Sequence, residues 1–301
     1  MAFLICLIGP TAIGKTDLAI KLAQHFATEI ISADSRQIFK EMTIGTAKPS
    51  PEELSLVKHH FVDSHAISEE FSVGHFEKQG LETLNHIFNT HQTAIMAGGS
   101  GLYVKAITQG FDELPLIPAS LREQLNARLR EYGIAPLQEQ LKELDPEYYA
   151  ALDVHNPQRV IRALEVCLHS GKKFSEFRIQ NQKKRPFRTI KIGLEMQREA
   201  LYERINQRVE LMMKAGLLKE VESLLAHRQL NALQTVGYQE LFEYLDGKCS
   251  LEAAVALIKQ NTRRFAKRQI TWFKRDPEIH WFEAGENQKI IEFVEETIRS
   301  A

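Results

Sequence analysis

The chain has 301 residues, of which 44% are hydrophobic and 26% charged, and its formal net charge is −1. This composition is typical of a globular protein, and the length suits one large domain or a domain that carries an insertion. No apolar run approaches the roughly 18 residues of a membrane-spanning helix, which excludes an integral membrane protein of the helical type.

The three cysteines, Cys6, Cys167 and Cys249, are scattered along the chain without C-x-x-C spacing. This pattern argues against disulfides and structural zinc, and it favours a reducing compartment. The apolar N-terminus lacks a basic leader region and a small-residue cleavage site, so it does not resemble a signal peptide. We therefore expect a cytoplasmic protein that does not contact a membrane.

Charge is unevenly distributed along the chain. Residues 1–115 contain 8 Lys and Arg against 13 Asp and Glu, whereas residues 116–188 contain 13 against 9. Residues 189–301 contain 17 of each. The net charge alone predicts no nucleic-acid partner, but a polyanion that binds this chain would dock on the positive middle section.

The first predicted elements are a strand, a glycine-containing loop and a helix. Residues 3–8 are all apolar and predict a short buried strand, and an apolar-periodic helix follows from residue 18. The loop between them reads G-x-x-x-x-G-K-T, and this strand–loop–helix context indicates a phosphate-binding loop. The loop consists of Gly9, Pro10, Thr11, Ala12, Ile13, Gly14, Lys15 and Thr16.

Each residue type in this loop has a chemical reason to be there. Gly9 and Gly14 allow the backbone to curl so that successive N–H groups point at one anion. Lys15 supplies a positive charge at the start of the helix, and the Thr16 hydroxyl can hold a Mg²⁺. The loop therefore predicts a phosphorylated ligand, but it leaves open whether that ligand is a nucleotide or another diphosphate.

A second short strand at residues 29–33 ends at Asp34, which is followed by Ser35, Arg36 and Gln37. Ligands of α/β sheets bind at the carboxyl ends of the strands, so we expect Asp34 to face the phosphate loop. Asp34 could be a Mg²⁺ ligand, a general base, or only a cap for the next turn. The cluster of polar residues at the same strand end favours a functional role.

A third strand at residues 93–97 ends in the glycine-rich sequence 98–103, which contains Ser100. Glycines at such a strand end predict close approach of the backbone to a ligand, with the Ser100 hydroxyl nearby. The alternative is that these glycines only tighten the turn between strand and helix. Between the second and third strands, the helical pattern of residues 73–89 predicts an amphipathic helix.

Two weaker candidate sites lie between the second and third strands. Lys48, in the polar turn 45–49, could contact a second phosphate, although a single loop lysine is more often plain surface. His59, His60, Asp63 and His65 form a cluster with some resemblance to a metal site. Without a nearby cysteine, metal binding there is the weaker of the two interpretations.

The middle section, residues 116–188, has a helical pattern and predicts an all-helical insertion in the α/β core. Asn156-Pro157 is a helix-start signal, because Asn is a favoured cap and Pro a favoured first helical residue. Arg159 and Arg162 are three residues apart and therefore lie on neighbouring positions of that helix.

The core is expected to resume with a strand at 189–194, followed by helices from 198 to 227 and a helix start at 236–240. Residues 258–275 contain seven Lys and Arg and no acidic residue. A phosphate-binding face is the favoured interpretation of this basic helix, and a solvated surface is the alternative. The fold class predicted by these elements is a phosphate-loop NTPase-like core, with a parallel sheet flanked by helices, in two sections (1–115 and 189–301) around the insertion.

Taken in order, these motifs resemble the tRNA dimethylallyltransferases, also called tRNA isopentenyltransferases, over essentially the whole chain. The matching segments are G-P-T-A-I-G-K-T at 9–16, A-D-S-R-Q at 33–37, G-T-A-K-P at 45–49, G-G-S-G-L-Y at 98–103, N-P-Q-R-V-I-R-A-L-E at 156–165, V-G-Y-Q-E at 236–240 and T-R-R-F-A-K-R-Q-I-T-W-F at 262–273. Ser100 departs from the Thr usual in the family but keeps the hydroxyl. The chain lacks the zinc-finger extension of eukaryotic members, so it looks like the bacterial form.

The resemblance implies transfer of the dimethylallyl group of dimethylallyl diphosphate to N6 of the adenosine 3′-adjacent to the anticodon. The phosphate loop and Mg²⁺ would stabilise the diphosphate leaving group, and Asp34 would take the amine proton. The target base would be flipped out of the anticodon loop into the protein. The implied partners are the tRNA anticodon stem-loop and dimethylallyl diphosphate, and we expect a monomer.

The resemblance also assigns residues to roles. Ser100 and Arg162 match positions near the diphosphate and the transferring group, and together with Asp34 they are the expected catalytic residues. The expected tRNA contacts are Asp34, Ser35, Arg36, Gln37, Ser100, Arg122, Gln158, Arg159, Val160, Ile161, Arg162, Gly237, Tyr238, Arg263, Arg264, Lys267 and Arg268. Thr16 is the expected metal ligand.

Three other functions would each explain part of the sequence. A small-molecule kinase would explain the loop, Mg²⁺ and Asp34, but not the basic helices. An adenylate isopentenyltransferase, which prenylates free AMP, ADP or ATP, would share the core but needs no grip on an anticodon stem. A non-catalytic nucleotide-dependent RNA-binding protein is disfavoured, because Asp34 accompanies an intact phosphate loop.

Overall fold

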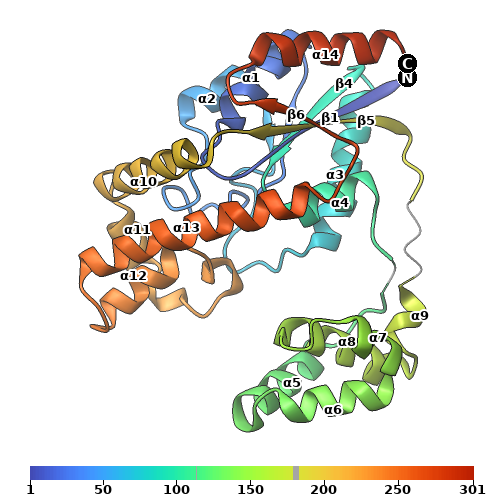
Figure 1. Ribbon diagram of the computed structural model, residues 1–301, viewed down its shortest axis with the longest axis vertical. Helices are drawn as coiled ribbons and strands as arrows, with labels where there is room; N and C mark the ends of the chain where they lie inside the picture. The colour runs from blue at the N-terminus through green and yellow to red at the C-terminus, as the bar shows by residue number, and fades with distance from the viewer. Residues whose placement is uncertain (113, 179–182) are drawn as a thin grey trace. The chain divides into compact units, whose positions relative to one another are not determined.

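The computed structural model describes residues 1–112, 114–178 and 183–301, and its centre is a six-stranded sheet (Figure 1). Every pair of neighbouring strands is parallel, and the strand order is β3-β2-β4-β1-β5-β6. The strands are β1 (Ala2–Ile8), β2 (Ile30–Ser32), β3 (His59–His60), β4 (Thr93–Gly98), β5 (Phe187–Glu195) and β6 (Ile279–Glu283).

The chain consists of two compact units, residues 1–109 with 185–301 and residues 110–184. The helices of the first unit are α1 (Lys15–His25), α2 (Pro51–Leu56), α3 (Val73–Phe88), α4 (Gly101–Thr108), α10 (Arg198–Lys214), α11 (Leu217–Ser223), α12 (Tyr238–Leu245), α13 (Leu251–Phe273) and α14 (Asn287–Arg299), with short 3-10 turns at Leu225–His227 and Asn231–Leu233. Within the described ranges, no helix has both the length and the apolar character needed to cross a membrane.

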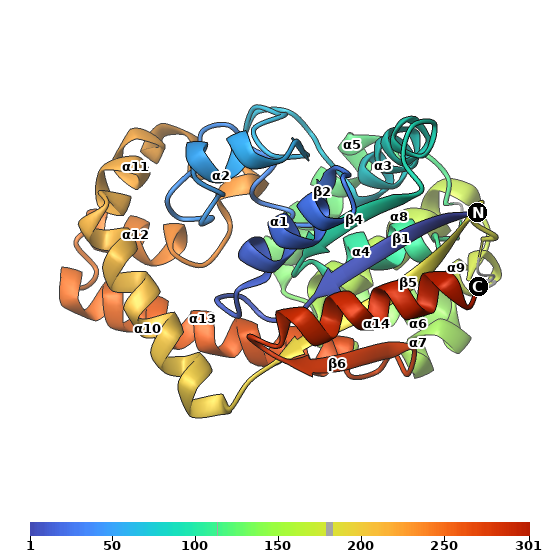
Figure 2. The same ribbon diagram turned by 90° about the horizontal axis from the view of Figure 1, so that it is seen from above.

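The sheet is apolar on both faces because β1 is buried on both sides. Leu4, Cys6 and Ile8 lie in one core, and the alternate residues Phe3, Ile5 and Leu7 lie in the other. Residues of α3 and α4 belong to the first core, and residues of α1 and α14 to the second. Helices consequently cover both faces of the sheet, as Figure 2 shows from above. This arrangement confirms the predicted fold class.

The strands predicted at 3–8, 29–33, 93–97 and 189–194 all exist, with ends that differ by at most two residues. Two edge strands were not predicted. In β3 only two residues, both half-buried histidines, pair with β2, and β6 presents four of its five residues partly or fully to solvent. Short, polar edge strands lack the apolar run that identifies a central strand.

The second unit is all-helical and has a core of its own. Its helices are α5 (Ala119–Tyr132), α6 (Ala135–Leu144), α7 (Pro146–Ala151), α8 (Pro157–Ser170) and α9 (Phe174–Phe177). As predicted, α8 begins after Asn156, whose side chain accepts a hydrogen bond from the backbone N–H of Arg159. Asp145 is fully buried, and its carboxylate joins the start of α7 to α9 by accepting bonds from the N–H groups of Tyr148 and Ser175.

The boundaries of the second unit fall a few residues before the expected 116–188. Phe187 and Arg188 already pair with β1, as the first residues of β5. Arg185 donates hydrogen bonds to the carbonyl oxygens of Ala106 (2.6 Å) and Ile107 (2.9 Å) at the end of α4, and it forms an ion pair with Glu77. These bonds attach the returning chain to the first unit before the strand begins.

Candidate active site at the carboxyl end of the sheet

The loop between β1 and α1 has the backbone that an anion-binding loop requires. Gly14 has a φ of 103°, in the left-handed region where a side chain is strained, and it precedes the first residue of α1. A Cβ on Gly9 would lie 3.0 Å from the carbonyl oxygen of Leu194 on the neighbouring strand β5. Glycine at position 9 therefore permits close packing of the loop on the sheet, and glycine at position 14 permits the turn into the helix.

Lys15 is folded back on its own loop. Its Nζ donates hydrogen bonds to the carbonyl oxygens of Gly9 (3.0 Å) and Pro10 (2.7 Å). Burial lowers the pKa of Lys15 to about 7, although the nearby Asp34 carboxylate opposes this shift, and Arg208 adds to it. The lysine thus holds its proton weakly when no anion is present.

Asp34 lies at the end of β2 and caps the turn that follows. Its Oδ1 accepts hydrogen bonds from the backbone N–H groups of Arg36 (2.9 Å) and Gln37 (3.4 Å). Asp34 also lines the same pocket as Lys15 and Thr16. The capping role and the expected position facing the phosphate loop are therefore both present, and the cap fixes the carboxylate in the pocket wall.

Ser100 connects the ends of β4 and β2. Its Oγ accepts a hydrogen bond from the backbone N–H of Ser35 (3.0 Å) and donates to the Ser35 hydroxyl (3.3 Å). Gly98 and Gly99 line the same pocket as Asp34, so close approach of a ligand to these glycines stays a prediction. The alternative, that they permit close packing at the turn, also has support. A Cβ would meet the Ala33 backbone at Gly98 and the Gln269 side chain at Gly99.

Two arginines of α10, Arg204 and Arg208, complete the charged wall of the pocket. Arg204 donates to the carbonyl oxygen of Ala12 (2.9 Å), and Arg208 lies 3.5 Å from the Thr11 hydroxyl. Burial lowers the pKa of Arg208, with the Asp34 carboxylate opposing. The sequence analysis missed both. Their spacing of four residues, which places them on one face of a helix, is the signal that could have indicated them.

Gln269 of α13 is a further residue that sequence reasoning missed. It is 7% exposed, its Oε1 accepts a hydrogen bond from the Thr11 backbone N–H (2.9 Å), and its Nε2 donates to the Gly99 carbonyl (3.0 Å). It thus bridges the phosphate loop and the turn after β4. No local pattern marks it, because its partners lie 258 and 170 residues away in the sequence.

These parts enclose one pocket of about 640 Å³. Its walls are the phosphate loop, the turn after β2, the loop around Thr46–Pro49, the turn after β4, and side chains of α10 and α13. The volume suits a small phosphorylated molecule, and Leu211 and Phe265 add apolar surface to a polar lining. The pocket can therefore hold a diphosphate beside the Asp34 carboxylate.

The two weaker candidates have structural roles. The Lys48 side chain is 2% exposed, donates to the carbonyl oxygen of Phe39 (2.6 Å) and pairs with Asp63, so it is neither plain surface nor free to bind a phosphate. His60 pairs with Glu29 at 2.5 Å, and His59 contacts the Val57 carbonyl at 2.8 Å. Across the described residues, no cluster of three or more His, Cys, Asp or Glu has the arrangement of a metal site.

In the second unit, a fully buried carboxylate holds two of the expected site residues. Glu165 forms ion pairs with Arg122 and with Arg162 (3.1 Å), and both guanidinium groups remain partly exposed. Gln158 and Arg159 are exposed in the first turn of α8. Val160 and Ile161 were expected to contact tRNA, but their side chains are buried in the core of this unit, which leaves them no surface for a nucleic acid.

Tyr238 needs the same correction. Its side chain is fully buried, and its hydroxyl donates a 2.6 Å hydrogen bond to Glu220. The adjacent Gly237 has a φ of 97° and caps the start of α12, where its N–H donates a 2.8 Å hydrogen bond to Glu240. The V-G-Y segment therefore builds the core behind the pocket, and the Tyr238 side chain is not available to a nucleic acid.

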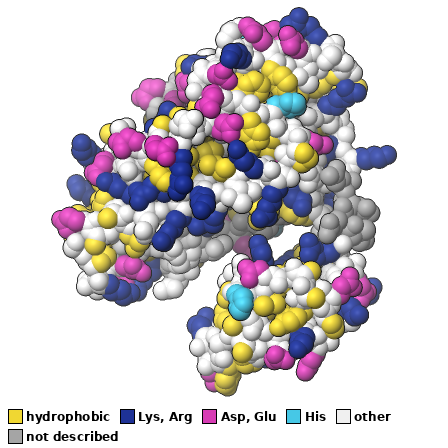
Figure 3. Space-filling view, viewed as in Figure 1, with side chains coloured by type: hydrophobic (Ala, Val, Ile, Leu, Met, Phe, Trp, Pro, Cys, Tyr) yellow, Lys and Arg dark blue, Asp and Glu magenta, His cyan; other side chains and the backbone are white. Residues whose placement is uncertain are grey.

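The basic face of α13 consists of Arg264, Lys267 and Arg268, whose spacing of three and four residues aligns them on an exposed side of the helix. Figure 3 shows Lys and Arg side chains over this part of the molecule. In the part of the chain that the structure describes, none of the three has a carboxylate within ion-pair distance. Arg263 differs, because it turns toward α10 and donates to Asn206 at 2.7 Å.

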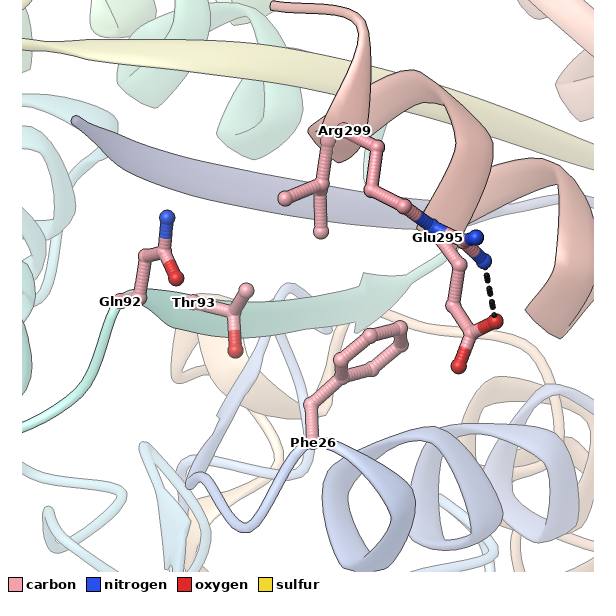
Figure 4. Close-up of a pocket in the computed structure, with 6 residues that line it drawn as sticks. Phe26, Gln92, Thr93, Glu295 and Arg299 are labelled. Atoms are coloured by element: carbon pink, nitrogen blue, oxygen red, sulfur yellow. Dashed lines mark hydrogen bonds and ion pairs between the residues drawn. The ribbon is translucent and has the colours of Figure 1, made fainter.

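A second hollow, of about 360 Å³, lies at the opposite end of β4 (Figure 4). Gln92 and Thr93 line it from the start of that strand, and Glu295 and Arg299 line it from α14. The two charged side chains form an ion pair with each other at 3.0 Å. Ligands of parallel sheets bind at the carboxyl ends of strands, so we place the active site in the first pocket.

Fold and site together define a phosphate-loop α/β enzyme. A family model described as IPP transferase matches residues 37–276. The chain is 55% identical to the tRNA dimethylallyltransferase of Christiangramia forsetii, over 99% of each chain. It is 51% identical to that of Flavobacterium johnsoniae, over 100% of each chain.

Solved structures agree with the sequence comparisons. The tRNA isopentenylpyrophosphate transferase of Bacillus halodurans has a TM-score of 0.75 and 35% identity, covering 100% of this chain and 98% of that one. A eukaryotic dimethylallyltransferase acting on tRNA has a TM-score of 0.84 and 25% identity, covering 100% and 80%. The chain therefore belongs to the IPP transferase family of tRNA dimethylallyltransferases. This confirms the predicted family and the predicted class of prenyl-transferring enzyme.

Proposed function

We propose that this enzyme transfers the dimethylallyl group of dimethylallyl diphosphate to N6 of the adenosine 3′-adjacent to the anticodon of a tRNA, with release of diphosphate. The observation that carries the proposal is that the Asp34 carboxylate lines the same pocket as Lys15 and Thr16 of the phosphate loop. A base and an anion site in one pocket suit a reaction in which an amine attacks and a diphosphate leaves. The named relatives support tRNA as the acceptor.

The diphosphate would bind at the phosphate loop, against Lys15 and Arg208. Placing an anion there would give Lys15 a partner better than the two carbonyl groups that it now contacts. The Thr16 hydroxyl and the Asp34 carboxylate are the hard oxygen donors that Mg²⁺ prefers, and this ion commonly takes only one or two protein ligands beside phosphates and water. We propose Thr16 as its protein ligand; bound there, the ion would neutralise charge on the leaving diphosphate.

Asp34 would act as the general base. As the adenosine N6 forms a bond to the first carbon of the allyl group, the carbon–oxygen bond to the diphosphate breaks and its electron pair leaves with the diphosphate. The amine nitrogen then carries an extra proton, which Asp34 accepts. The backbone bonds from Arg36 and Gln37 hold Oδ1, so the carboxylate is oriented before the substrate arrives.

We assign supporting roles to other residues of the site. The Ser100 hydroxyl, held by Ser35, would contact the reacting groups beside Asp34. We also propose Arg162, whose guanidinium pairs with Glu165, as a catalytic residue, in line with the resemblance. Ser35, Arg36 and Gln37 would contact the anticodon loop, as would Arg122, Gln158 and Arg159 of the second unit, and the basic face of α13 would bind phosphates of the stem. We propose a cytoplasmic monomer.

A prenyl-transfer assay tests the proposal. Labelled dimethylallyl diphosphate and Mg²⁺ are incubated with the enzyme and with either an unmodified tRNA whose anticodon edge reads A-A-A, or free AMP and ATP. We expect label in tRNA alone. Label in free nucleotide would favour an adenylate isopentenyltransferase, and no label with either acceptor would contradict the proposal.

A further inference from the structure

Glu220 of α11 collects hydrogen bonds from a loop far away in the sequence. Its Oε2 accepts from the backbone N–H groups of Thr43 (3.0 Å) and Ile44 (2.7 Å), and its Oε1 accepts from that of Gly45 (3.0 Å). Oε1 also accepts the 2.6 Å bond from the Tyr238 hydroxyl. One carboxylate therefore satisfies four donors, three of which are consecutive backbone amides.

Three consecutive N–H groups that converge on one point form an anion-binding concavity. Here the anion belongs to the protein itself, and bonds to an ionised acceptor are stronger than those between neutral groups. Gly45 is part of this arrangement, because a Cβ there would lie 2.5 Å from the Tyr238 ring. The loop is thus held both by charge and by close packing.

The loop that Glu220 holds continues directly into the pocket wall. Thr46 and Ala47 line the pocket, and their carbonyl oxygens accept hydrogen bonds from Nε2 of Gln37, at 3.3 and 3.1 Å. The backbone N–H of Gln37 in turn donates to Oδ1 of Asp34. A continuous set of bonds therefore leads from Glu220 through the loop and Gln37 to the proposed base.

We propose that Glu220 is a positioning residue, which fixes residues 43–47 as a wall of the pocket and, through Gln37, fixes the turn that holds Asp34. Glu220 does not itself line the pocket and takes no part in bond making. Tyr238 supports it by donating the fourth hydrogen bond. The expected effect on catalysis rests on the proposed function. The hydrogen bonds of Glu220 do not, because they can be measured without substrate.

The test compares Glu220→Gln with Glu222→Gln, a matched control on an exposed position of the same helix. Glutamine keeps one accepting oxygen, but its NH2 group replaces the other and would face an N–H donor, so at least one of the amides of 43–45 would lose its acceptor. We expect their hydrogen exchange to become about 10- to 100-fold faster, with little change in β1 and α1. We also expect kcat for prenyl transfer to fall about 10-fold or more, with the KM for dimethylallyl diphosphate nearly unchanged, because the phosphate loop is untouched.

Tyr238→Phe provides a second variant that keeps the carboxylate and the three amide bonds. We expect a smaller acceleration of exchange, confined to the same loop. Unchanged exchange at 43–45 in Glu220→Gln would overturn the proposal, and so would faster exchange throughout the first unit, which would indicate general destabilisation. If the wild-type enzyme showed no prenyl transfer, the proposed function would fail while the exchange measurement still tested Glu220.

Discussion

Gln269 is hydrogen-bonded to Thr11, so the helix with the basic face is tied directly to the phosphate loop. The Thr11 N–H donates a hydrogen bond to Gln269 Oε1 at 2.9 Å, and Nε2 of the same side chain donates to the Gly99 carbonyl oxygen. Arg268 precedes Gln269 in α13 and is exposed. A shift of α13 on binding a polyanion would therefore also move the phosphate loop.

Replacing Gln269 with Ala should weaken diphosphate binding. Thr11 N–H and the Gly99 carbonyl would lose their partner in a largely buried place, and each lost bond costs about 1 kcal/mol. We expect the Kd of dimethylallyl diphosphate, measured by calorimetry, to rise about tenfold. Gln260→Ala, at an exposed position of the same helix, is the control. Equal affinities in the two variants would show that the bridge does not shape the loop.

The lowered pKa of Lys15 predicts that diphosphate affinity depends on pH. Below about pH 7 the lysine is already protonated, whereas above it the free protein must take up a proton to bind the anion. We expect affinity for inorganic diphosphate to fall by up to about tenfold per pH unit above pH 7. Lys15→Arg stays charged and should lose the part of the pH dependence that comes from Lys15. The titration of diphosphate itself affects both proteins equally, so the difference between them reports on Lys15.

The stability of the folded chain should follow the opposite trend. An unfolded Lys15 keeps its proton up to its ordinary pKa of 10.5. Between about pH 7 and that value the unfolded state binds more protons, so the contribution of Lys15 to the free energy of unfolding rises with pH. Affinity that fell together with thermal stability would point to unfolding and not to Lys15.

The variant Asp34→Asn distinguishes the proposed role of Asp34 as a general base from its role as the cap of the turn. Asparagine retains an Oδ1 that can accept from Arg36 and Gln37, so the turn should persist, but it cannot take a proton. We expect tRNA binding by filter assay to be largely intact and turnover to fall about 10²- to 10⁴-fold. Asp34→Ala should disturb the turn as well. Near-normal turnover in Asp34→Asn would rule out the general-base assignment.

The basic face of α13 predicts salt-sensitive binding of tRNA. If Arg264, Lys267 and Arg268 neutralise phosphates, each replacement by Ala should reduce the slope of log affinity against log salt concentration by about 1. Lys274, which pairs with Glu195 at 3.1 Å, is the control, and its replacement should leave the slope nearly unchanged. Affinity that does not vary with salt in the wild-type protein would refute the role of this face.

The sequence predicted the parts of the site that have a local pattern. The strand–loop–helix at Gly9–Thr16 and the acid at the end of β2 could be recognised because each lies within a few residues of its own structural context. The helix start at Asn156 was recognisable for the same reason, since a cap and its helix are neighbours in the chain. The central strands followed from their apolar runs, because a parallel strand covered on both faces has few polar residues.

Residues that act through distant partners could not be found in this way. Arg208, Gln269 and Glu220 are ordinary polar residues of helices until the fold brings them against loops that come much earlier in the chain. Lys48 shows the reverse error, since a lysine in a polar turn proved to be buried against Asp63 and the Phe39 carbonyl. Tyr238 was assigned to tRNA with its motif, although burial of its ring is what that motif provides.

Arg185 fixes the point at which the chain returns from the second unit to the first. Because it binds the carbonyl groups of Ala106 and Ile107, the outgoing and returning segments of the chain meet at one point of the first unit. The pairing of β5 with β1 therefore begins at a position set by this junction and not by the length of chain between residues 110 and 184. Relatives or engineered variants could shorten, lengthen or replace that insertion without shifting the strand register on which the phosphate loop depends.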